Sequence, residues 1–104
     1  METTHIFIKT EYRLENIALQ DILYIEGMQG YLRIIMINRK IMTKQSFKTI
    51  LEQLPGNKFI QVHKSWVVNL AKIESIERNR IKIANQLIPV GDSFKENFYR
   101  HIKS

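Results

Sequence analysis

One stretch decides the fold of this chain: Phe59-Ile60-Gln61-Val62-His63-Lys64-Ser65-Trp66-Val67-Val68-Asn69-Leu70. It begins with β-branched and aromatic residues, which favour a strand. It continues after the turn with the apolar run Trp66-Val67-Val68, which needs a core to bury it. Between these two parts stands the polar segment His63-Lys64-Ser65. Because both flanks must go inside, we expect this polar turn to be presented rigidly to a partner.

Short strand-like runs separated by tight turns fill most of the remaining chain. Glycine and asparagine mark the turns most clearly at 27–30, at Asn79 and at 84–86. Pro89 predicts an edge strand or a strand end. The expected strands are residues 6–10, 12–19, 22–26, 31–37, 40–44, 72–78, 80–83 and 87–90.

Two segments have a helical period instead. An internal helix is predicted to begin after Ser46 as N-cap and to end at 55–57, with its apolar face formed by Phe47, Ile50, Leu51 and Leu54. A second helix is predicted at the C-terminus, where Ser93 and Glu96 have the spacing of a capping box. An apolar stripe follows there at Phe94, Phe98 and Ile102. The fold class is therefore mostly β, with one internal helix and a C-terminal helix.

The length and composition of the chain indicate one domain over residues 1–104, large enough for a modest core. The chain has no cysteine, which excludes disulfides and thiolate metal sites. No apolar run approaches the length of a membrane span, and the first five residues are polar rather than a secretion signal. We therefore expect a cytoplasmic protein without membrane contact.

Basic residues outnumber acidic ones by sixteen to ten, which gives a net charge of +6 and a pI near 9.7. The excess is uneven, because residues 53–104 carry nine basic and four acidic side chains and residues 1–52 carry seven and six. A basic half of this kind suits a polyanion such as nucleic acid. The alternative is a solvated surface that is merely basic.

Catalytic chemistry has little support in the sequence. His5, His63 and His101 are far apart, and none has metal-ligand spacing to another candidate ligand. Ser65 lies two residues from His63, but no third orienting group can be named. We therefore predict no enzymatic activity, no catalytic residues, no metal site and no cofactor.

Three residues have alternative interpretations. Trp66 is interpreted as a core anchor, and base stacking is the alternative, which would suit a single-strand binder better than a duplex reader. Tyr31 fits equally well as a core aromatic or as an outward-facing residue beside the glycine-rich turn. Asn69 is expected to cap the local backbone through its side chain, and contact with a ligand is the alternative.

Three polar turns, taken together, indicate a binding function rather than a purely structural role. They cover residues 28–31, 63–65 and 91–95, and each follows a well-defined strand. Loops that project from one side of a rigid β scaffold could address the grooves of a duplex. Basic side chains would then bind phosphates, and polar tips would reach base edges.

With these turns identified, nearly the whole chain resembles the LytTR family of bacterial DNA-binding domains. The matching motifs are Asp21-Ile22-Leu23-Tyr24-Ile25-Glu26, Tyr31-Leu32-Arg33-Ile34, the helix 46–55, the stretch 59–69 and Lys72-Ile73-Glu74-Ser75-Ile76. The resemblance implies an elongated fold of several small antiparallel sheets. Such a domain lies along one side of the duplex and places loops in successive major grooves.

Carried over by position, the resemblance implies base contacts from all three turns. These are Gln29 and Tyr31 in the first, His63 and Lys64 in the second, and Gly91, Asp92 and Ser93 with Lys95 in the third. Ser65 of the second turn is also predicted to be a DNA-binding residue. Arg33 and Lys44 lie on the expected strand bodies, where their shorter reach suits contacts to the DNA backbone.

The chain departs from the family pattern at two turns. His63-Lys64-Ser65 stands where His-Arg-Ser is common, and lysine lacks the flat fork that reads guanine best. Gly91-Asp92 stands where many relatives have Ser-Arg. Since Asp92 cannot bind phosphate, it could at most accept from a cytosine amino group, and Ser93 or Lys95 is the alternative contact.

The resulting interpretation is a sequence-specific double-stranded DNA-binding output domain of a bacterial two-component response regulator. Its implied partners are promoter repeats and a phosphorylatable receiver domain outside this sequence. We expect the isolated domain to be a monomer. The alternative is a small basic β-domain that binds RNA or a protein with the same turns.

Overall fold

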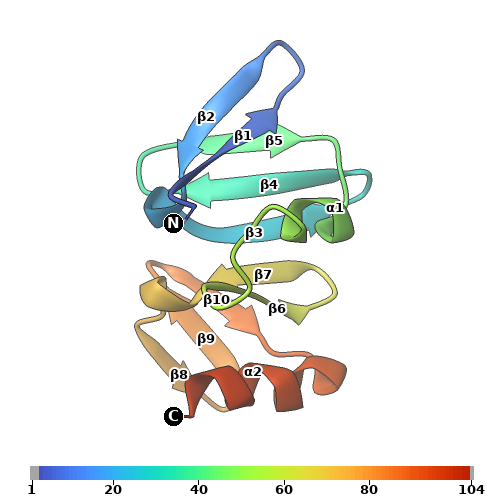
Figure 1. Ribbon diagram of the computed structural model, residues 1–104. Helices are drawn as coiled ribbons and strands as arrows, with labels where there is room; N and C mark the ends of the chain where they lie inside the picture. The colour runs from blue at the N-terminus through green and yellow to red at the C-terminus, as the bar shows by residue number, and fades with distance from the viewer. Residues whose placement is uncertain (1–2, 104) are drawn as a thin grey trace.

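The computed structural model describes residues 3–103 as three antiparallel sheets and two α-helices (Figure 1). Residues 1, 2 and 104 lie outside the described part, including the start of the polar N-terminal segment. The elements are β1 (His5–Lys9), β2 (Leu14–Ala18), η1 (Leu19–Asp21), β3 (Ile22–Met28), β4 (Tyr31–Met36), β5 (Lys40–Thr43), α1 (Phe47–Leu51), β6 (Phe59–His63), β7 (Trp66–Asn69), η2 (Leu70–Lys72), β8 (Ser75–Glu77), β9 (Arg80–Ile83), β10 (Gln86–Pro89), η3 (Asp92–Phe94) and α2 (Lys95–Ile102).

The largest sheet has five strands in the order β5-β4-β3-β7-β6. Its centre is the pairing of β3 with β7, in which Glu26 lies opposite Trp66 and Ile25 opposite Val67. This pairing connects the first half of the chain to the stretch 59–70. The predicted strand, polar turn and apolar run of that stretch are confirmed as the β6–β7 hairpin.

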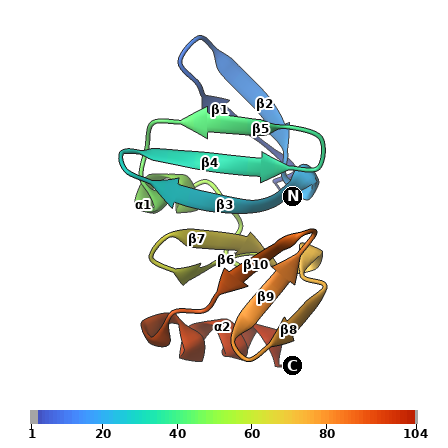
Figure 2. The ribbon, with the colours of Figure 1, turned by 180° about the vertical axis from the view of Figure 1, so that it is seen from behind.

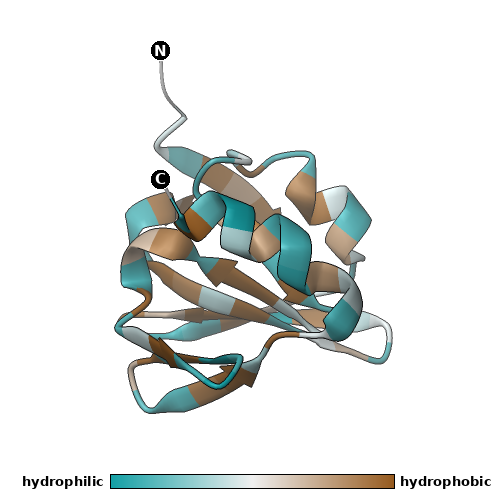
Figure 3. Ribbon diagram, turned by 90° about the horizontal axis from the view of Figure 1, so that it is seen from below, coloured by the Kyte–Doolittle hydropathy of each residue, from teal (hydrophilic) through white to brown (hydrophobic). Residues whose placement is uncertain are grey.

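Two cores form on opposite faces of this sheet. Successive strand residues point to opposite faces, so Val67 joins the core beneath β1, β2 and α1, whereas Val68 joins the core formed with β8–β10 and α2. Figure 3 shows the corresponding alternation of hydrophobic and hydrophilic residues along the strands. The β6–β7 hairpin therefore contributes to both cores.

The second core is closed by a three-stranded sheet in the order β10-β9-β8. Arg78 and Asn79 form the β8–β9 turn with φ of 52° and 60°, and two successive residues with positive φ are typical of a tight primed hairpin turn. Ala84 begins the β9–β10 turn with φ of 53°. Both predicted turns are confirmed, and Pro89 ends the edge strand β10 as expected.

The internal helix is present but shorter than predicted. Ser46 is its N-cap, and the Ser46 hydroxyl accepts a hydrogen bond from the Thr49 N–H at 3.2 Å. The helix ends at Leu51, and the chain then continues through turns toward Pro55. Leu54 is nevertheless buried in the first core.

The predicted capping box at Ser93 and Glu96 is wrong. A 3-10 turn, η3, precedes α2, and no side chain caps the helix. Within η3, the Phe94 N–H donates to the Gly91 carbonyl at 2.9 Å. Of the predicted apolar stripe, Phe98 is fully buried, whereas Ile102 is 38% exposed.

The molecule extends over 40 × 34 × 24 Å, with β1–β5 in one half and β6–β10 and α2 in the other (Figures 1 and 2). Within residues 3–103, no helix is long and apolar enough to cross a membrane.

Asn69→Ala should destabilise the fold by about 2–4 kcal/mol. The Asn69 side chain is buried, donates to the Ile22 carbonyl at 2.8 Å and accepts from the Ala71 N–H at 3.1 Å. Truncation therefore leaves two backbone groups without partners. Urea unfolding measures the change, and Asn16→Ala on the exposed face of β2 is the control, expected within about 0.5 kcal/mol of wild type. Equal effects of the two substitutions would contradict this role of Asn69.

Candidate nucleic-acid interface

Three turns gather along one edge of the molecule, here called the turn edge. They are the β3–β4 turn (28–31), the β6–β7 turn (64–65) and the segment 91–94 after β10. Figures 1 and 2 both show them on the same side, together with the segment that leads from β5 to α1. The three polar turns singled out in the sequence are therefore neighbours in space.

Backbone hydrogen bonds hold the central turn to each of its neighbours. The Gly27 N–H donates to the Ser65 carbonyl at 2.8 Å, which joins the end of β3 to the β6–β7 turn. The Gly91 N–H donates to the Val62 carbonyl at 2.8 Å, which joins the third turn to β6. The relative position of the turns is thus set by main-chain bonds rather than by flexible side chains.

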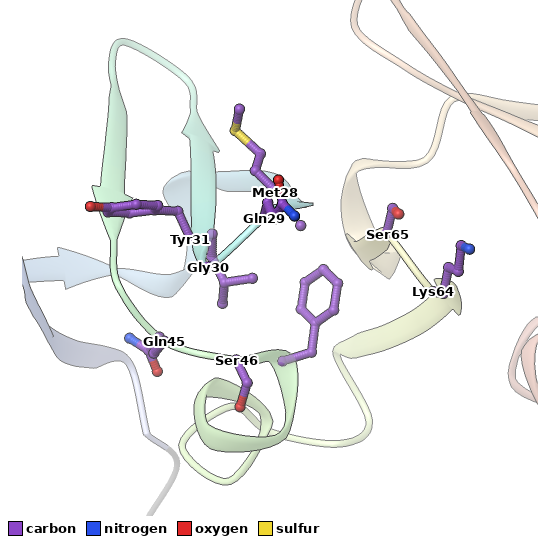
Figure 4. Close-up of a pocket in the computed structure, with 11 residues that line it drawn as sticks. Met28, Gln29, Gly30, Tyr31, Gln45, Ser46, Lys64 and Ser65 are labelled. Atoms are coloured by element: carbon purple, nitrogen blue, oxygen red, sulfur yellow. The ribbon is translucent and has the colours of Figure 1, made fainter.

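A hollow of about 560 Å³ lies between the first two turns. It brings together four predicted site residues, Gln29, Tyr31, Lys64 and Ser65. Figure 4 shows Met28 and Gln29 at the tip of the β3–β4 turn, between Tyr31 on one side and Ser65 and Lys64 on the other. Tyr31 is 44% exposed, so the outward-facing alternative is correct for this residue.

The floor of this hollow depends on a close approach between β3 and α1. A Cβ added to Gly27 would lie 2.8 Å from Cε2 of Phe47. Only glycine at this position lets the Phe47 ring reach the sheet without displacement. Phe47 is one of the residues whose place at the site the sequence analysis missed, because its apolar spacing indicated only the helix core.

Gln45 was also missed, although it lines both this hollow and a second one of about 750 Å³ beside it. Its Nε2 donates to the Thr43 hydroxyl at 3.0 Å, and that hydroxyl donates to the Lys9 carbonyl at 2.8 Å. The Gln45 Oε1 atom is buried and is the one such side-chain atom without a hydrogen-bond partner in residues 3–103. The position of Gln45 just before the N-cap Ser46 was the sequence signal that could have indicated its place at the site.

Lys44 lines the second hollow together with Tyr31. It lies one residue beyond the end of β5, so its predicted place on a strand body is wrong. The chain leaves the strand there because Gln45 and Ser46 turn toward α1. This position puts Lys44 close to the turn edge rather than on the sheet surface.

Arg33 lies within β4, opposite Glu26 of β3, and is ion-paired with it. Hydrogen bonding to the Glu26 carboxylate raises the pKa of the Arg33 guanidinium above its ordinary value. An arginine held by a cross-strand carboxylate has less free charge for a phosphate. Arg33 is thus placed on a strand body as expected, but it is not a free cation.

The third turn carries an internal ion pair. The Lys95 Nζ lies 2.8 Å from a carboxylate oxygen of Asp92. Hydrogen bonding to Lys95 lowers the pKa of the Asp92 carboxyl below its ordinary value. The acidic residue that departs from the expected pattern therefore neutralises the nearest lysine. Ser93 between them is exposed.

Trp66 and Asn69 lie where the sequence analysis expected them. The Trp66 ring packs against the second core and lies 5.7 Å from the Tyr24 ring, centroid to centroid. Asn69 caps the start of η2 through its side chain. In residues 3–103, no three His, Asp or Glu side chains are grouped so that they could hold a metal ion.

A family model described as the LytTr DNA-binding domain matches residues 12–103. The chain belongs to the LytTR family. An uncharacterized response regulatory protein of Vibrio cholerae is 33% identical over 67 residues, which are 61% of this chain and 26% of that protein. The chain thus matches about a quarter of the length of this curated relative.

A solved structure from Bacillus cereus, the LytTr DNA-binding domain of a protein described as a methyl-accepting/DNA response regulator, has the same fold. It aligns with a TM-score of 0.82 at 19% identity, and covers 99% of this chain and 100% of that one. The prediction of a LytTR-like fold with several small antiparallel sheets and two helices is therefore confirmed.

Gly27→Ala should destabilise this LytTR domain by about 1–3 kcal/mol, because the added methyl overlaps the Phe47 ring. Gly56→Ala is the matched control, since no heavy atom lies within 4 Å of its added Cβ. We expect the control to be neutral or to stabilise by about 0.4–1 kcal/mol. Thermal melting measures both. The double variant Gly27→Ala with Phe47→Leu should recover part of the loss, and a purely additive result would contradict the proposed contact.

Proposed function

We propose that this LytTR domain binds double-stranded DNA in a sequence-specific manner through the turn edge, as the output domain of a bacterial transcriptional response regulator. The observation that carries the proposal is the fixed spacing of the three turns by the Gly27–Ser65 and Gly91–Val62 backbone bonds. Specific recognition requires side chains whose positions are set before the duplex arrives.

The charges at this edge suit the proposal. Lys64 at the central turn and Lys44 beside the first turn are both exposed, and neither forms an ion pair within residues 3–103. We assign to Lys44 the attraction to phosphate that underlies binding to any duplex, and to Lys64 a contact with a base edge. Arg33 and Lys95 are held by carboxylates, so we assign them smaller contributions.

Polar tips beside these lysines supply the groups that could read bases. Gln29 is exposed at the tip of the first turn, and Lys64 is exposed at the second. An amide can pair with adenine and an ammonium with guanine acceptors in the major groove. We propose Gln29, Tyr31, His63, Lys64 and Ser65 as the main contact set, with Ser93 and Lys95 at its margin.

The wider setting is part of the same proposal. The similarity to a response regulatory protein about four times as long as the matched segment supports a receiver domain in the functional regulator. We propose that the output domain acts in the cytoplasm on promoter repeats and is monomeric when isolated. Light scattering over a range of concentrations tests the last point, and a dimer at every concentration would contradict it.

Selection of bound duplexes from a random pool tests the proposed function. We expect the selection to enrich one motif. Gel shifts on that motif, on random duplex and on single-stranded RNA should then show the tightest binding to the selected duplex. An unenriched pool, or a preference for the RNA, would refute sequence-specific binding to double-stranded DNA.

Lys64→Ala and Lys44→Ala should separate base recognition from charge attraction. Lys64→Ala should weaken the selected duplex by about 1–3 kcal/mol and leave random duplex almost unchanged. Lys44→Ala should weaken both duplexes equally and reduce the salt slope by about one unit. Fluorescence anisotropy at several salt concentrations measures these quantities. If the two variants behave alike, the β6–β7 turn acts only as part of a basic surface.

Asp92→Asn should strengthen binding to both selected and random duplexes. The substitution removes a negative charge from the turn edge and releases Lys95 from its ion pair, so the salt slope should steepen by up to about one unit. Glu77→Gln on β8, which lies away from the turn edge (Figure 1), makes the same change in net charge and is the control. A gain from the control as large as that from Asp92→Asn would indicate a general effect of net charge.

A further inference from the structure

The β6–β7 turn is closed by a side chain. The Ser65 N–H donates to the Nδ1 atom of His63 at 3.1 Å, two residues back along the chain. The His63 carbonyl in turn accepts from the Gln61 Nε2 atom at 3.2 Å. Both the ring and the backbone of His63 are therefore engaged in holding the turn.

This closure replaces the usual backbone solution. Two-residue hairpin turns commonly use positive φ to match the twist of their strands. Positive φ within residues 3–103 occurs at Gly30, Arg78, Asn79 and Ala84, and at neither Lys64 nor Ser65. The strand irregularity between Gln61 and His63 and the ring-to-backbone bond compensate for the missing conformation.

The bond fixes the protonation of the ring. A backbone N–H can only donate, so the Nδ1 atom must present a lone pair and carry no proton. A neutral imidazole then carries its single proton on Nε2. The geometry of the turn thus selects one tautomer, with an N–H donor at the far end of the ring.

The direction of that donor is fixed as well. Gly91 packs against the ring, because a Cβ added to Gly91 would lie 3.4 Å from Cδ2 of His63 and 3.2 Å from the Phe94 ring. The His63 ring is thus held between the second and third turns. The Nε2 atom has no hydrogen-bond partner within residues 3–103 and is not among the buried polar atoms there.

We propose that His63 is an uncharged, pre-oriented hydrogen-bond donor whose Nε2–H contacts an acceptor on the duplex, while its Nδ1 atom holds the β6–β7 turn. This inference rests on the proposed function. Suitable acceptors are a phosphate oxygen and the acceptor atoms of base edges, such as purine N7. Amino groups of cytosine and adenine are excluded, since two donors cannot pair.

The proposal has a measurable signature because the ring carries no charge. A cation that contacts phosphate contributes about 0.9 unit to the salt slope, whereas a neutral donor releases no counterion. Loss of the Nε2–H contact should therefore weaken binding without changing the salt slope. Loss of a charged imidazolium contact would change both quantities.

Two substitutions separate the roles of the ring nitrogens. An asparagine side-chain oxygen commonly accepts from the backbone N–H two residues on, so His63→Asn should keep the turn and lose the distal donor. His63→Ala loses both. We expect His63→Asn to melt near wild type and His63→Ala to melt lower. Both should bind the selected duplex about 3- to 10-fold more weakly, and His63→Asn should keep the salt slope of wild type.

The comparison of selected and random duplexes identifies the acceptor. Weaker binding of His63→Asn to the selected duplex alone indicates a base edge, and equal weakening on both indicates a phosphate oxygen. Binding as tight as wild type would overturn the proposed contact. A salt slope reduced by about one unit would overturn the neutral ring.

The tautomer itself can be tested without DNA. Long-range nitrogen–proton NMR spectra of the imidazole distinguish a protonated ring nitrogen from one with a lone pair, and we expect the lone pair at Nδ1 at neutral pH. Protonated Nδ1 would overturn the inference. If wild type bound no duplex, the proposed function would fail and the DNA contact with it, whereas the tautomer result would still report separately on the turn.

Discussion

The pairing of β3 with β7 is the interaction on which the rest of the structure depends. It joins the two halves of the chain in one sheet, and the alternation along β7 sends Val67 to one core and Val68 to the other. Each core alone is small for an independent fold. Because the hairpin is shared, neither core can shift without moving the strand that carries the β6–β7 turn. The same pairing extends past Glu26 and Trp66 into the Gly27–Ser65 bond, so the sheet ends directly in the proposed DNA-binding surface.

The chemistry of the turn edge follows from which charges are free and which are paired. Two cations near it, Arg33 and Lys95, are held by carboxylates, and the exposed Lys95–Asp92 pair contributes little to stability. Their more consequential effect is on the surface potential, because a paired cation attracts phosphate less. Lys44 and Lys64 form no ion pair within residues 3–103, and in our proposal His63 adds a directional contact without charge. We therefore assign general attraction to Lys44, base recognition to Lys64 and an uncharged contact to His63.

Much of this fold could be predicted from residue patterns because the signals were local. The β6–β7 hairpin, the Ser46 cap, the turn at Asn79 and the strand end at Pro89 each depend on neighbours within a few residues. The features that sequence reasoning missed depend on contacts across the fold. Phe47 reaches the site because α1 packs close to Gly27, and the Gln45 side chain is bonded there to Thr43. The 3-10 turn η3 stands in place of the expected capping box, after Gly91, which a backbone bond holds to β6. The pairing of Arg33 with Glu26 likewise required the strand register.

The shared hairpin also bears on how the domain opens. Binding loops are usually drawn from the least stable parts of a protein, which fray many times for each global unfolding event. Here the β6–β7 turn extends from the strand pair that both cores hold in place. Amide hydrogens at the β3–β7 seam, including that of Gly27, should be among the last to exchange with solvent. The turn that we propose as the DNA contact then belongs to the most cooperative part of the domain, so it has little conformational entropy left to lose on binding.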